Sequence, residues 1–286
     1  MRALILGSSG RLGRYLKQHI QGLGVEVDTP MIRISNGLQV QNFLSLENYQ
    51  VVFNCIGLVG VEICETNQDA AILLNRDLPT LLSKEALKYD YKFVQFSTPS
   101  VFSGENAPNI ESDVPDSPSI YGRTKLQGEE GALGVNPETL VIRLNFFGLH
   151  PSKNTLAMQI LENARNGLGF KAFDDMWFNP MYALHAAEMS VKLAVSNNSG
   201  IFHIGSPGVM SKYEFTKLIY EFMGLDSGLV ECVQNASLFN NPLHSTNTTL
   251  ASARAEEVGF RVPSVSDGIR SLISEFQQAN QLGREI

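Results

Sequence analysis

The feature that most constrains this chain is a run of three glycines, Gly7, Gly10 and Gly13. An apolar stretch at 3–6 precedes the run, and residues 14–20 follow it with helical spacing. We therefore predict a strand, a tight turn and a helix. Glycines at such a turn allow close approach of a phosphate, and the amino end of the helix leaves N–H groups free to bind it. The pattern favours nucleotide binding over an ordinary turn.

Apolar segments and helical patterns alternate through the first half of the chain. The expected strands lie at 25–27, 51–54, 92–96 and 139–144, and the expected helices at 38–46, 69–89 and 121–133. This alternation predicts an α/β fold, a Rossmann-type doubly wound parallel sheet with helices on both faces.

Beyond residue 150 the alternation loosens. The expected helices there are 156–166, 183–195, 212–222 and 266–278, and the expected strands are 170–173 and 201–204. We expect residues 1–150 to form an NAD(P)-binding Rossmann domain, with 170–205 rejoining its sheet. Residues 151–169 and 206–286 are expected to form a smaller C-terminal substrate lobe beside the carboxyl ends of the strands.

Composition argues against several partners. The chain has 22 Lys+Arg against 29 Asp+Glu, a net charge of −7, and no basic run, so we do not expect it to bind nucleic acid. No stretch approaches the roughly 18 apolar residues of a membrane span, and we expect no signal peptide. The three cysteines, Cys55, Cys64 and Cys232, show no CxxC spacing. We expect reduced thiols, a cytoplasmic location and no metal site.

Two Tyr-xxx-Lys pairs occur, Tyr121/Lys125 and Tyr213/Lys217. Tyr121 follows a strand that ends near Thr98, so a hydroxyl at that strand end would meet the tyrosine over the glycine turn. No such strand precedes Tyr213, and we interpret the second pair as helix surface. On a helix, the Lys125 charge would lower the pKa of the Tyr121 phenol towards neutrality. The phenol would then protonate a carbonyl oxygen as hydride reaches the carbon.

These segments resemble the extended short-chain dehydrogenase/reductases, and within them the dTDP-4-dehydrorhamnose reductase-like branch. The segments that carry the resemblance are 7–13, 51–57, 64–67 followed by Asn75, 96–102, 121–129 and 143–148. The resemblance implies a reductase of a nucleotide-linked keto-deoxysugar, with NADP or NAD in reduced form as the hydride donor. Whether the chain forms a homodimer stays open at this point.

The residues and the resemblance together give the candidate site. The expected catalytic residues are Thr98, Tyr121 and Lys125, with Ser97 as the alternative to Thr98. The expected cofactor contacts are Gly7, Ser9, Gly10, Arg11, Leu12, Gly13, Asp28, Asn54, Cys55, Ile56, Gly57, Tyr121 and Lys125. The resemblance implies substrate contacts at Ser100, Asn145, His150, Asn154 and Trp177. Each has an ordinary alternative, such as a strand-end cap for Asn145, core packing for Trp177 or simple exposure for His150.

Cofactor choice stays open at the level of sequence. An acid at the end of the second strand, Asp28, favours NAD because it would hydrogen-bond the ribose and repel a 2′-phosphate. Arg11, Arg14 and Arg33 favour NADP, since a guanidinium pairs well with phosphate. We expect both cofactors to be used without strong preference.

Two other functions remain as alternatives. One is a nucleotide-sugar epimerase or dehydratase of the same fold, although Thr98-Pro99-Ser100 supplies neither the acid pair of a dehydratase nor the thiol of an epimerase. The other is a non-catalytic regulatory subunit resembling that of methionine adenosyltransferase. The intact set of Thr98, Tyr121 and Lys125 argues against it.

Overall fold

The computed structural model describes residues 2–32, 34, 48–151, 155–234 and 241–281 of the 286-residue chain. Its strands are β1 (Arg2–Leu6), β2 (Glu26–Asp28), β3 (Val51–Asn54), β4 (Lys92–Ser97), β5 (Leu140–Leu144), β6 (Phe146–Phe147), β7 (Phe170–Phe173), β8 (Trp177–Phe178), β9 (Met181–Tyr182), β10 (Gly200–Ile204), β11 (Met210–Ser211) and β12 (Val230–Val233). Its helices are α1 (Arg11–Gly22), α3 (Val61–Thr66), α4 (Gln68–Ala71), η1 (Ile72–Asp77), α5 (Leu78–Tyr89), η2 (Pro99–Val101), α6 (Ile120–Val135), α7 (Leu156–Arg165), α8 (Ala183–Val195), α9 (Lys212–Phe222), η3 (Ser227–Leu229), α11 (Ala253–Glu257) and α12 (Val265–Gln281).

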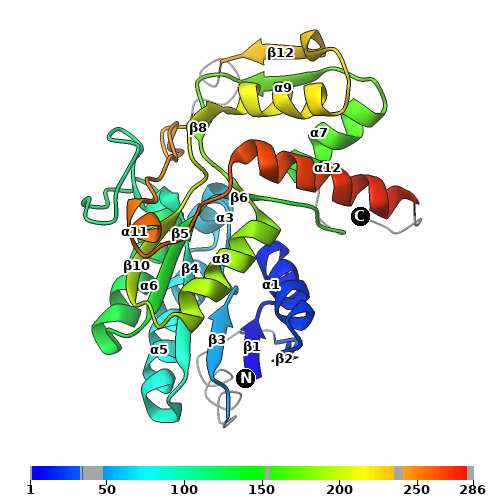
Figure 1. Ribbon diagram of the computed structural model, residues 1–286. Helices are drawn as coiled ribbons and strands as arrows, with labels where there is room; N and C mark the ends of the chain where they lie inside the picture. The colour runs from blue at the N-terminus through cyan, green and yellow to red at the C-terminus, as the bar shows by residue number, and fades with distance from the viewer. Residues whose placement is uncertain (1, 33, 35–47, 152–154, 235–240, 282–286) are drawn as a thin grey trace.

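A six-stranded parallel sheet forms the base of the fold, in the order β10-β5-β4-β3-β1-β2 (Figure 1). This confirms the expected Rossmann-type α/β class. The chain order reverses between β1 and β3, and open α/β sheets bind ligands at the carboxyl ends of strands beside such a reversal.

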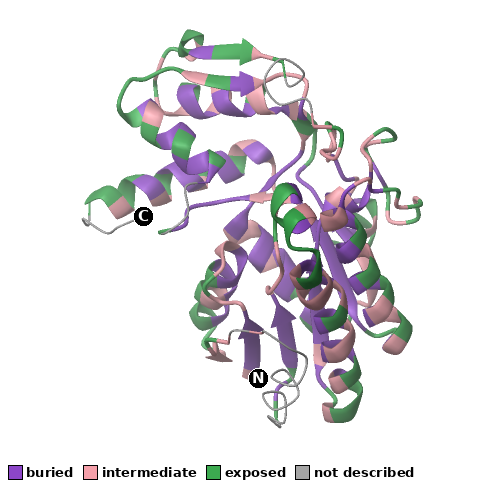
Figure 2. Ribbon diagram, turned by 180° about the vertical axis from the view of Figure 1, so that it is seen from behind, coloured by how far each residue is buried: buried purple, intermediate pink, exposed green. Residues whose placement is uncertain are grey.

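Both faces of the sheet are covered by helices, which explains why its strands are apolar throughout. Ala3 and Ile5 point into the cluster that holds α1 and α8, whereas Leu4 and Leu6 point into the cluster that holds α5. Figure 2 shows the central strands buried and the outer surfaces of the helices exposed.

The second half of the chain divides between this sheet and a group of elements above it. β10 pairs with β5 and so joins the main sheet, as expected for 201–204. β7 does not, because it pairs with β12 in a separate two-stranded sheet packed on α9. The expectation that 170–173 rejoins the main sheet is therefore wrong. In Figure 1, α7, α9, α12 and β12 lie together above the sheet. The domain boundaries themselves stay a prediction.

The expected helix 69–89 is interrupted by a π-helical turn, η1, between α4 and α5. The wide turn contains Asn75, which is buried. Its amide accepts a hydrogen bond from the Leu58 N–H at 2.9 Å and donates to the Leu58 carbonyl at 3.0 Å. Helical periodicity does not predict this turn, because the Asn75 side chain bonds to the backbone of Leu58, which lies outside the helix. The expected helix 38–46 lies outside the described residues.

Candidate active site

The glycine turn between β1 and α1 is built for close backbone approach. Gly7 has φ +78°, and a Cβ added there would lie 2.9 Å from the Cys55 carbonyl carbon. A Cβ on Gly13 would lie 2.5 Å from the Gly7 oxygen. Gly10 caps α1 without a side chain, and the first turn of the helix holds no acidic residue. The N–H groups at the start of α1 are thus available to an anion such as a phosphate.

Arg11, the first residue of α1, adds a half-buried positive charge at this turn. Burial lowers the pKa of its guanidinium. The guanidinium lies over the Phe146 ring, 5.0 Å from the centroid, and NH1 donates to the Phe146 carbonyl at 3.4 Å. Its Nε is buried with no hydrogen-bond partner. A buried donor without a partner beside free helix N–H groups fits a pyrophosphate.

The loop after β3 lies against the glycine turn. Asn54 shapes it, since the side-chain oxygen accepts from the Ile56 N–H at 3.1 Å and the side-chain amide donates to Gln95 at 2.8 Å. A Cβ on Gly57 would meet Asn75 Oδ1 at 3.0 Å and Lys125 Nζ at 4.0 Å. The fold therefore brings together the backbone of Gly7, Cys55, Ile56 and Gly57, four of the expected cofactor contacts. Of the other expected contacts in the turn, Ser9 is exposed and the Leu12 side chain packs into the core.

Asp28 ends β2, as expected, but its carboxylate is already bound. Oδ2 accepts from the Tyr49 hydroxyl at 2.6 Å and pairs with Arg2 at 2.7 Å. Arg2 thus offsets the negative charge that was expected to repel a 2′-phosphate.

Thr98 and Tyr121 meet at the carboxyl end of the sheet. Thr98 follows β4 directly, is buried, and accepts from the Ser100 N–H at 3.1 Å through its hydroxyl. Tyr121 is the second residue of α6, whose first turn is capped by the Ser119 hydroxyl. The neighbouring Thr98 hydroxyl lowers the pKa of Tyr121, but burial is the larger effect and raises it.

Lys125 lies one turn further along α6, buried, with Nζ donating to the Phe96 carbonyl at 2.6 Å. Burial lowers its pKa to about 8, against the opposing effect of Glu129. The expectation that Lys125 moves the phenol towards neutrality is wrong for this structure. The pKa of Tyr121 lies above its usual value because burial disfavours the phenolate, and the ammonium is held by the Phe96 carbonyl.

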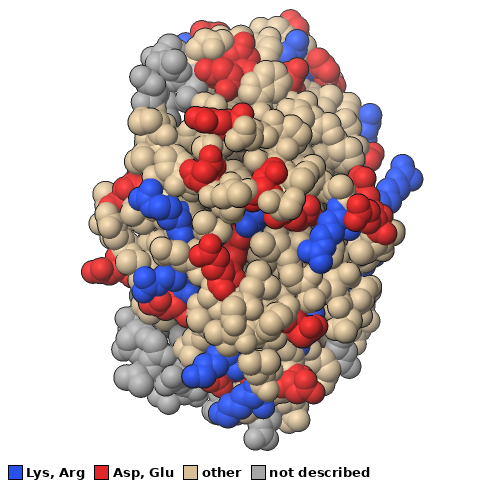
Figure 3. Space-filling model, turned by 90° about the vertical axis from the view of Figure 1, so that its left-hand side faces the viewer, with Lys and Arg blue, Asp and Glu red and all other residues tan. Residues whose placement is uncertain are grey.

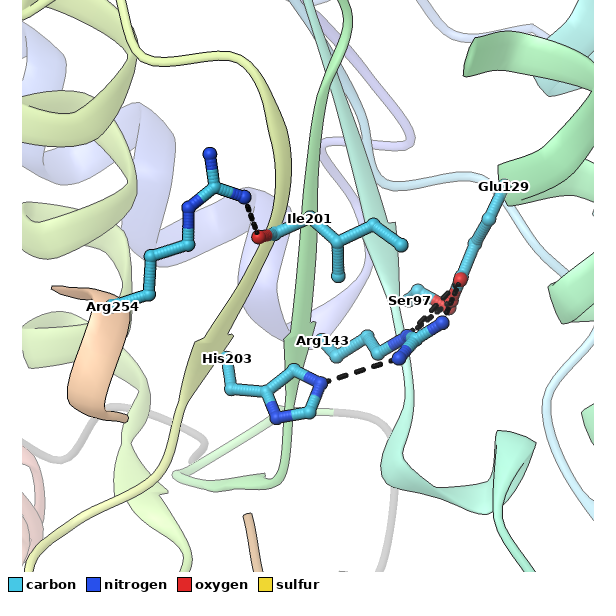
Figure 4. A network of polar contacts seen from close by, with 6 residues as sticks. All are labelled: Ser97, Glu129, Arg143, Ile201, His203 and Arg254. Atoms are coloured by element: carbon cyan, nitrogen blue, oxygen red, sulfur yellow. Dashed lines mark hydrogen bonds and ion pairs between the residues drawn. The ribbon is translucent and has the colours of Figure 1, made fainter. Parts of the chain in front are cut away.

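Ser97, the alternative hydroxyl, belongs to a buried network instead (Figure 4). It donates to the Glu129 carboxylate, which also binds Arg143 through Nε at 3.1 and 3.0 Å and through NH2 at 2.6 Å. Burial and Arg143 lower the pKa of His203 to about 4, so the imidazole is neutral and Nε2 accepts from Arg143 at 3.3 Å. Among the two hydroxyls, the structure therefore places Thr98 against Tyr121.

Two cysteines lie near the ammonium of Lys125. Burial is the main reason why the pKa values of Cys55 and Cys64 are raised, and Lys125 only partly opposes it. Both side chains are neutral thiols at physiological pH, so neither is suited to serve as a base.

Three expected substrate contacts line one cavity of about 200 Å³ next to Thr98. Ser100, Asn145 and Trp177 border it, together with Val61, Phe102, Ser117, Pro118, Met176, Phe178, Lys212, Leu243, His244, Ser245, Thr246 and Thr248. Asn145 and Phe178 also line a smaller cavity of about 90 Å³ that includes Arg11 of the glycine turn. The two cavities thus share a wall between the glycine turn and the expected substrate position.

The remaining expected substrate residues are placed differently. His150 is buried, and its Nε2 lies 2.9 Å from the Ser9 carbonyl oxygen, so it packs on the glycine turn rather than in the larger cavity. Asn154 lies outside the described residues. In the second Tyr-xxx-Lys pair, Tyr213 packs against the core and Lys217 lies over its ring.

Sequence reasoning missed the contribution of residues 241–250 and of Lys212. The Asn145 side chain donates to the Thr248 hydroxyl at 2.8 Å, and the backbone N–H of Trp177 donates to the Thr246 carbonyl at 2.7 Å. His244 pairs with Glu62 of α3 at 2.7 Å. These contacts join segments far apart in the sequence, and no local sequence motif predicts them.

Within the residues that the structure describes, no group of three or more His, Cys, Asp or Glu side chains could hold a metal ion. None of the described helices is long and apolar enough to span a bilayer. On the face drawn in Figure 3, basic and acidic side chains are interspersed.

Comparison with known proteins adds to this geometry. The RmlD substrate binding domain family matches residues 1–278. A dTDP-4-keto-6-deoxy-D-glucose reductase of Streptomyces niveus is 28% identical over 265 residues, covering 91% of this chain and 91% of that protein. The crystal structure of a dTDP-4-dehydrorhamnose reductase from Clostridium acetobutylicum is 27% identical, with a TM-score of 0.88 over 97% of this chain and 100% of that one. A Bacillus anthracis dTDP-4-dehydrorhamnose reductase in complex with NADP has the same fold, with a TM-score of 0.87 at 20% identity over 96% of this chain and 99% of that one. The chain belongs to the RmlD substrate binding domain family.

Proposed function

We propose that this protein is an NAD(P)H-dependent reductase of a nucleotide-linked keto-deoxysugar. One observation carries the proposal: Thr98 lies beside Tyr121 and two residues before Ser100 of the cavity, and Lys125 Nζ lies 4.0 Å from a Cβ placed on Gly57, in the loop that packs on the glycine turn. The reductase names of the relatives support the same class of reaction.

The nicotinamide cofactor, when bound, supplies the hydride. Gly7, Gly10 and Gly13 would let it approach the backbone, and Arg11 with the N–H groups of α1 would hold its pyrophosphate. The cradle fits such a group, because a side chain at Gly7 or Gly13 would collide with the chain and Arg11 Nε is left without a partner. The Bacillus anthracis relative is in complex with NADP, which supports a nicotinamide cofactor for this fold.

The chain itself positions the keto group and provides the proton. Thr98 lies beside the Tyr121 phenol, where its hydroxyl can orient the phenol. The raised pKa keeps Tyr121 protonated at neutral pH, so it is ready to donate to the carbonyl oxygen of the substrate. Lys125, held by the Phe96 carbonyl, places a positive charge near the oxyanion that develops.

Cavity residues suit a nucleotide-linked sugar. Ser100 and Asn145 offer neutral hydrogen-bonding groups beside the reacting centre. Trp177 is 40% exposed at the same cavity and offers a surface on which a base stacks.

The test is turnover with a panel of nucleotide-linked keto-sugars and reduced cofactor. We expect one of them to be reduced, with loss of the reduced-nicotinamide absorbance and a product heavier by two hydrogens. An epimerase would give an isomer without consuming cofactor, and a dehydratase would release water. A regulatory subunit would bind cofactor and turn over none of the panel, so each alternative has a separate outcome.

A further inference from the structure

Lys212 is a charged residue of the substrate cavity that the proposed mechanism leaves without a role. It begins α9 and reaches the cavity because Ser211 pairs with Trp177 between β11 and β8. Its own N–H donates to the Met176 carbonyl at 3.0 Å, which fixes the residue beside β8. Among the described residues that line this cavity, Lys212 is the only lysine or arginine.

The partners of the Lys212 ammonium carry no negative charge. Nζ lies 3.4 Å from the sulfur of Met176 and 5.8 Å from the centroid of the Phe173 ring. No carboxylate of the described part of the chain lies within 4.0 Å of it. Burial lowers the pKa of Lys212, and Asp175 opposes that shift only in part. A half-buried ammonium with such weak partners lacks the anion that normally accompanies a buried cation.

The other positive groups at this cavity already have partners, so an anionic ligand would bind the Lys212 ammonium. The amino end of α9 is already satisfied by a capping box, in which Ser211 and Glu214 bond each other's N–H groups. His244, another basic side chain at the cavity, is paired with Glu62. The positive charge available to a ligand in this cavity therefore resides on Lys212.

We propose that Lys212 binds the diphosphate of the nucleotide-linked substrate, an inference that rests on the proposed function. A diphosphate supplies the missing negative charge and several acceptor oxygens for the three N–H donors of an ammonium. The Trp177 ring and the Ser100 hydroxyl border the same cavity, so the base and the sugar have surfaces on it as well.

The experiment is calorimetric titration of dTDP, thymidine and NADPH into the wild type and two variants. Lys212→Met removes the charge and keeps an unbranched side chain beside Met176. Lys217→Met is the matched control, because Lys217 is on the same helix, also lies over an aromatic ring, and does not line the cavity. We expect Lys212→Met to bind dTDP about 10- to 100-fold more weakly, with thymidine and NADPH affinities unchanged. Lys217→Met should bind all three like the wild type.

Stability distinguishes this role from a purely structural one. Removing an unpaired half-buried cation should leave the thermal midpoint of the ligand-free protein unchanged or higher, whereas loss of a structural lysine would lower it. As a second variant, Lys212→Arg should retain dTDP binding within a few-fold. Equal dTDP affinity in the wild type and Lys212→Met would overturn the diphosphate assignment while leaving the proposed function standing. A wild type that binds NADPH but no dTDP would overturn both.

Discussion

The Thr98 hydroxyl lies beside the Tyr121 phenol and lowers its pKa, so that the end of β4 meets the start of α6. The neighbouring Ser97 hydroxyl points instead into the Glu129–Arg143 network. Adjacent residues of an extended strand point to opposite sides, so only one of these two hydroxyls can face the tyrosine. We therefore expect the Thr98 hydroxyl to act in the reaction and the Ser97 hydroxyl to support the buried ion pair.

Removing each of these two hydroxyls in turn should lower activity in one variant and stability in the other. Thr98→Val should lower kcat strongly with little change in the free energy of unfolding, because the Tyr121 phenol loses its orienting partner. Ser97→Ala should cost about 1–3 kcal/mol of stability, since the buried Glu129 carboxylate loses a donor, and should leave kcat near the wild-type value. Steady-state kinetics and urea unfolding of both variants check this, and the reverse pattern would make Ser97 the catalytic hydroxyl.

The buried Glu129–Arg143 ion pair should dominate the stability of this part of the fold. Both side chains are 1% exposed. Glu129→Gln leaves the Arg143 charge unpaired and should reduce the free energy of unfolding by about 3–5 kcal/mol. The matched control, Glu130→Gln, changes an exposed neighbour on α6 and should have little effect. Denaturant unfolding measures both, and equal midpoints would show that the pair does not stabilise the fold.

Lys125 gives the fold a pH dependence of predictable sign. Its folded pKa, about 8, lies below the ordinary value of 10.5 because of burial. The unfolded chain therefore binds more protons between pH 8 and 10.5, and the stability of the folded state increases with pH through that window. Relative to Lys125→Met, the wild type should gain about 3 kcal/mol from pH 8 to 10.5. A constant difference between the two proteins across this range would contradict the burial argument.

The Arg2–Asp28 pair should set the balance between the two cofactors. Because Arg2 offsets the Asp28 charge, we expect NADH and NADPH affinities within about 100-fold of each other. Arg2→Ala frees the carboxylate and should weaken NADPH binding more than NADH binding, since only NADPH carries the 2′-phosphate. Calorimetric titration of both cofactors tests this; equal weakening would indicate a general structural effect of Arg2.

Local sequence patterns predicted the parts of the molecule that local physics determines. The strand, turn and helix around Gly7 form as expected, since a positive φ and close packing against Cys55 require glycine there. Tyr121 and Lys125 share a face of α6 because residues four apart on a helix are neighbours. The predicted roles of these residues, and of the other site residues, stay predictions.

The features that could not be predicted depend on contacts between segments far apart in the sequence. Lys212 reaches the cavity through the pairing of β11 with β8, and His150 reaches the glycine turn through a bond to the Ser9 carbonyl. Neither partner lies near in sequence. The pKa of Tyr121 was predicted with the wrong sign because burial, which depends on the whole fold, is the largest effect on it.

The central claim is tested most directly by oxidation of NADPH in the presence of a dTDP-linked 4-keto-6-deoxy sugar, measured for the wild type, Tyr121→Phe and Tyr213→Phe. Removing only the transferable proton should lower the turnover of Tyr121→Phe by about 10²–10⁴-fold while its NADPH affinity stays unchanged. Tyr213→Phe, the matched change in the other Tyr-xxx-Lys pair, should turn over like the wild type. Wild-type turnover in Tyr121→Phe together with an inactive Tyr213→Phe would contradict the account.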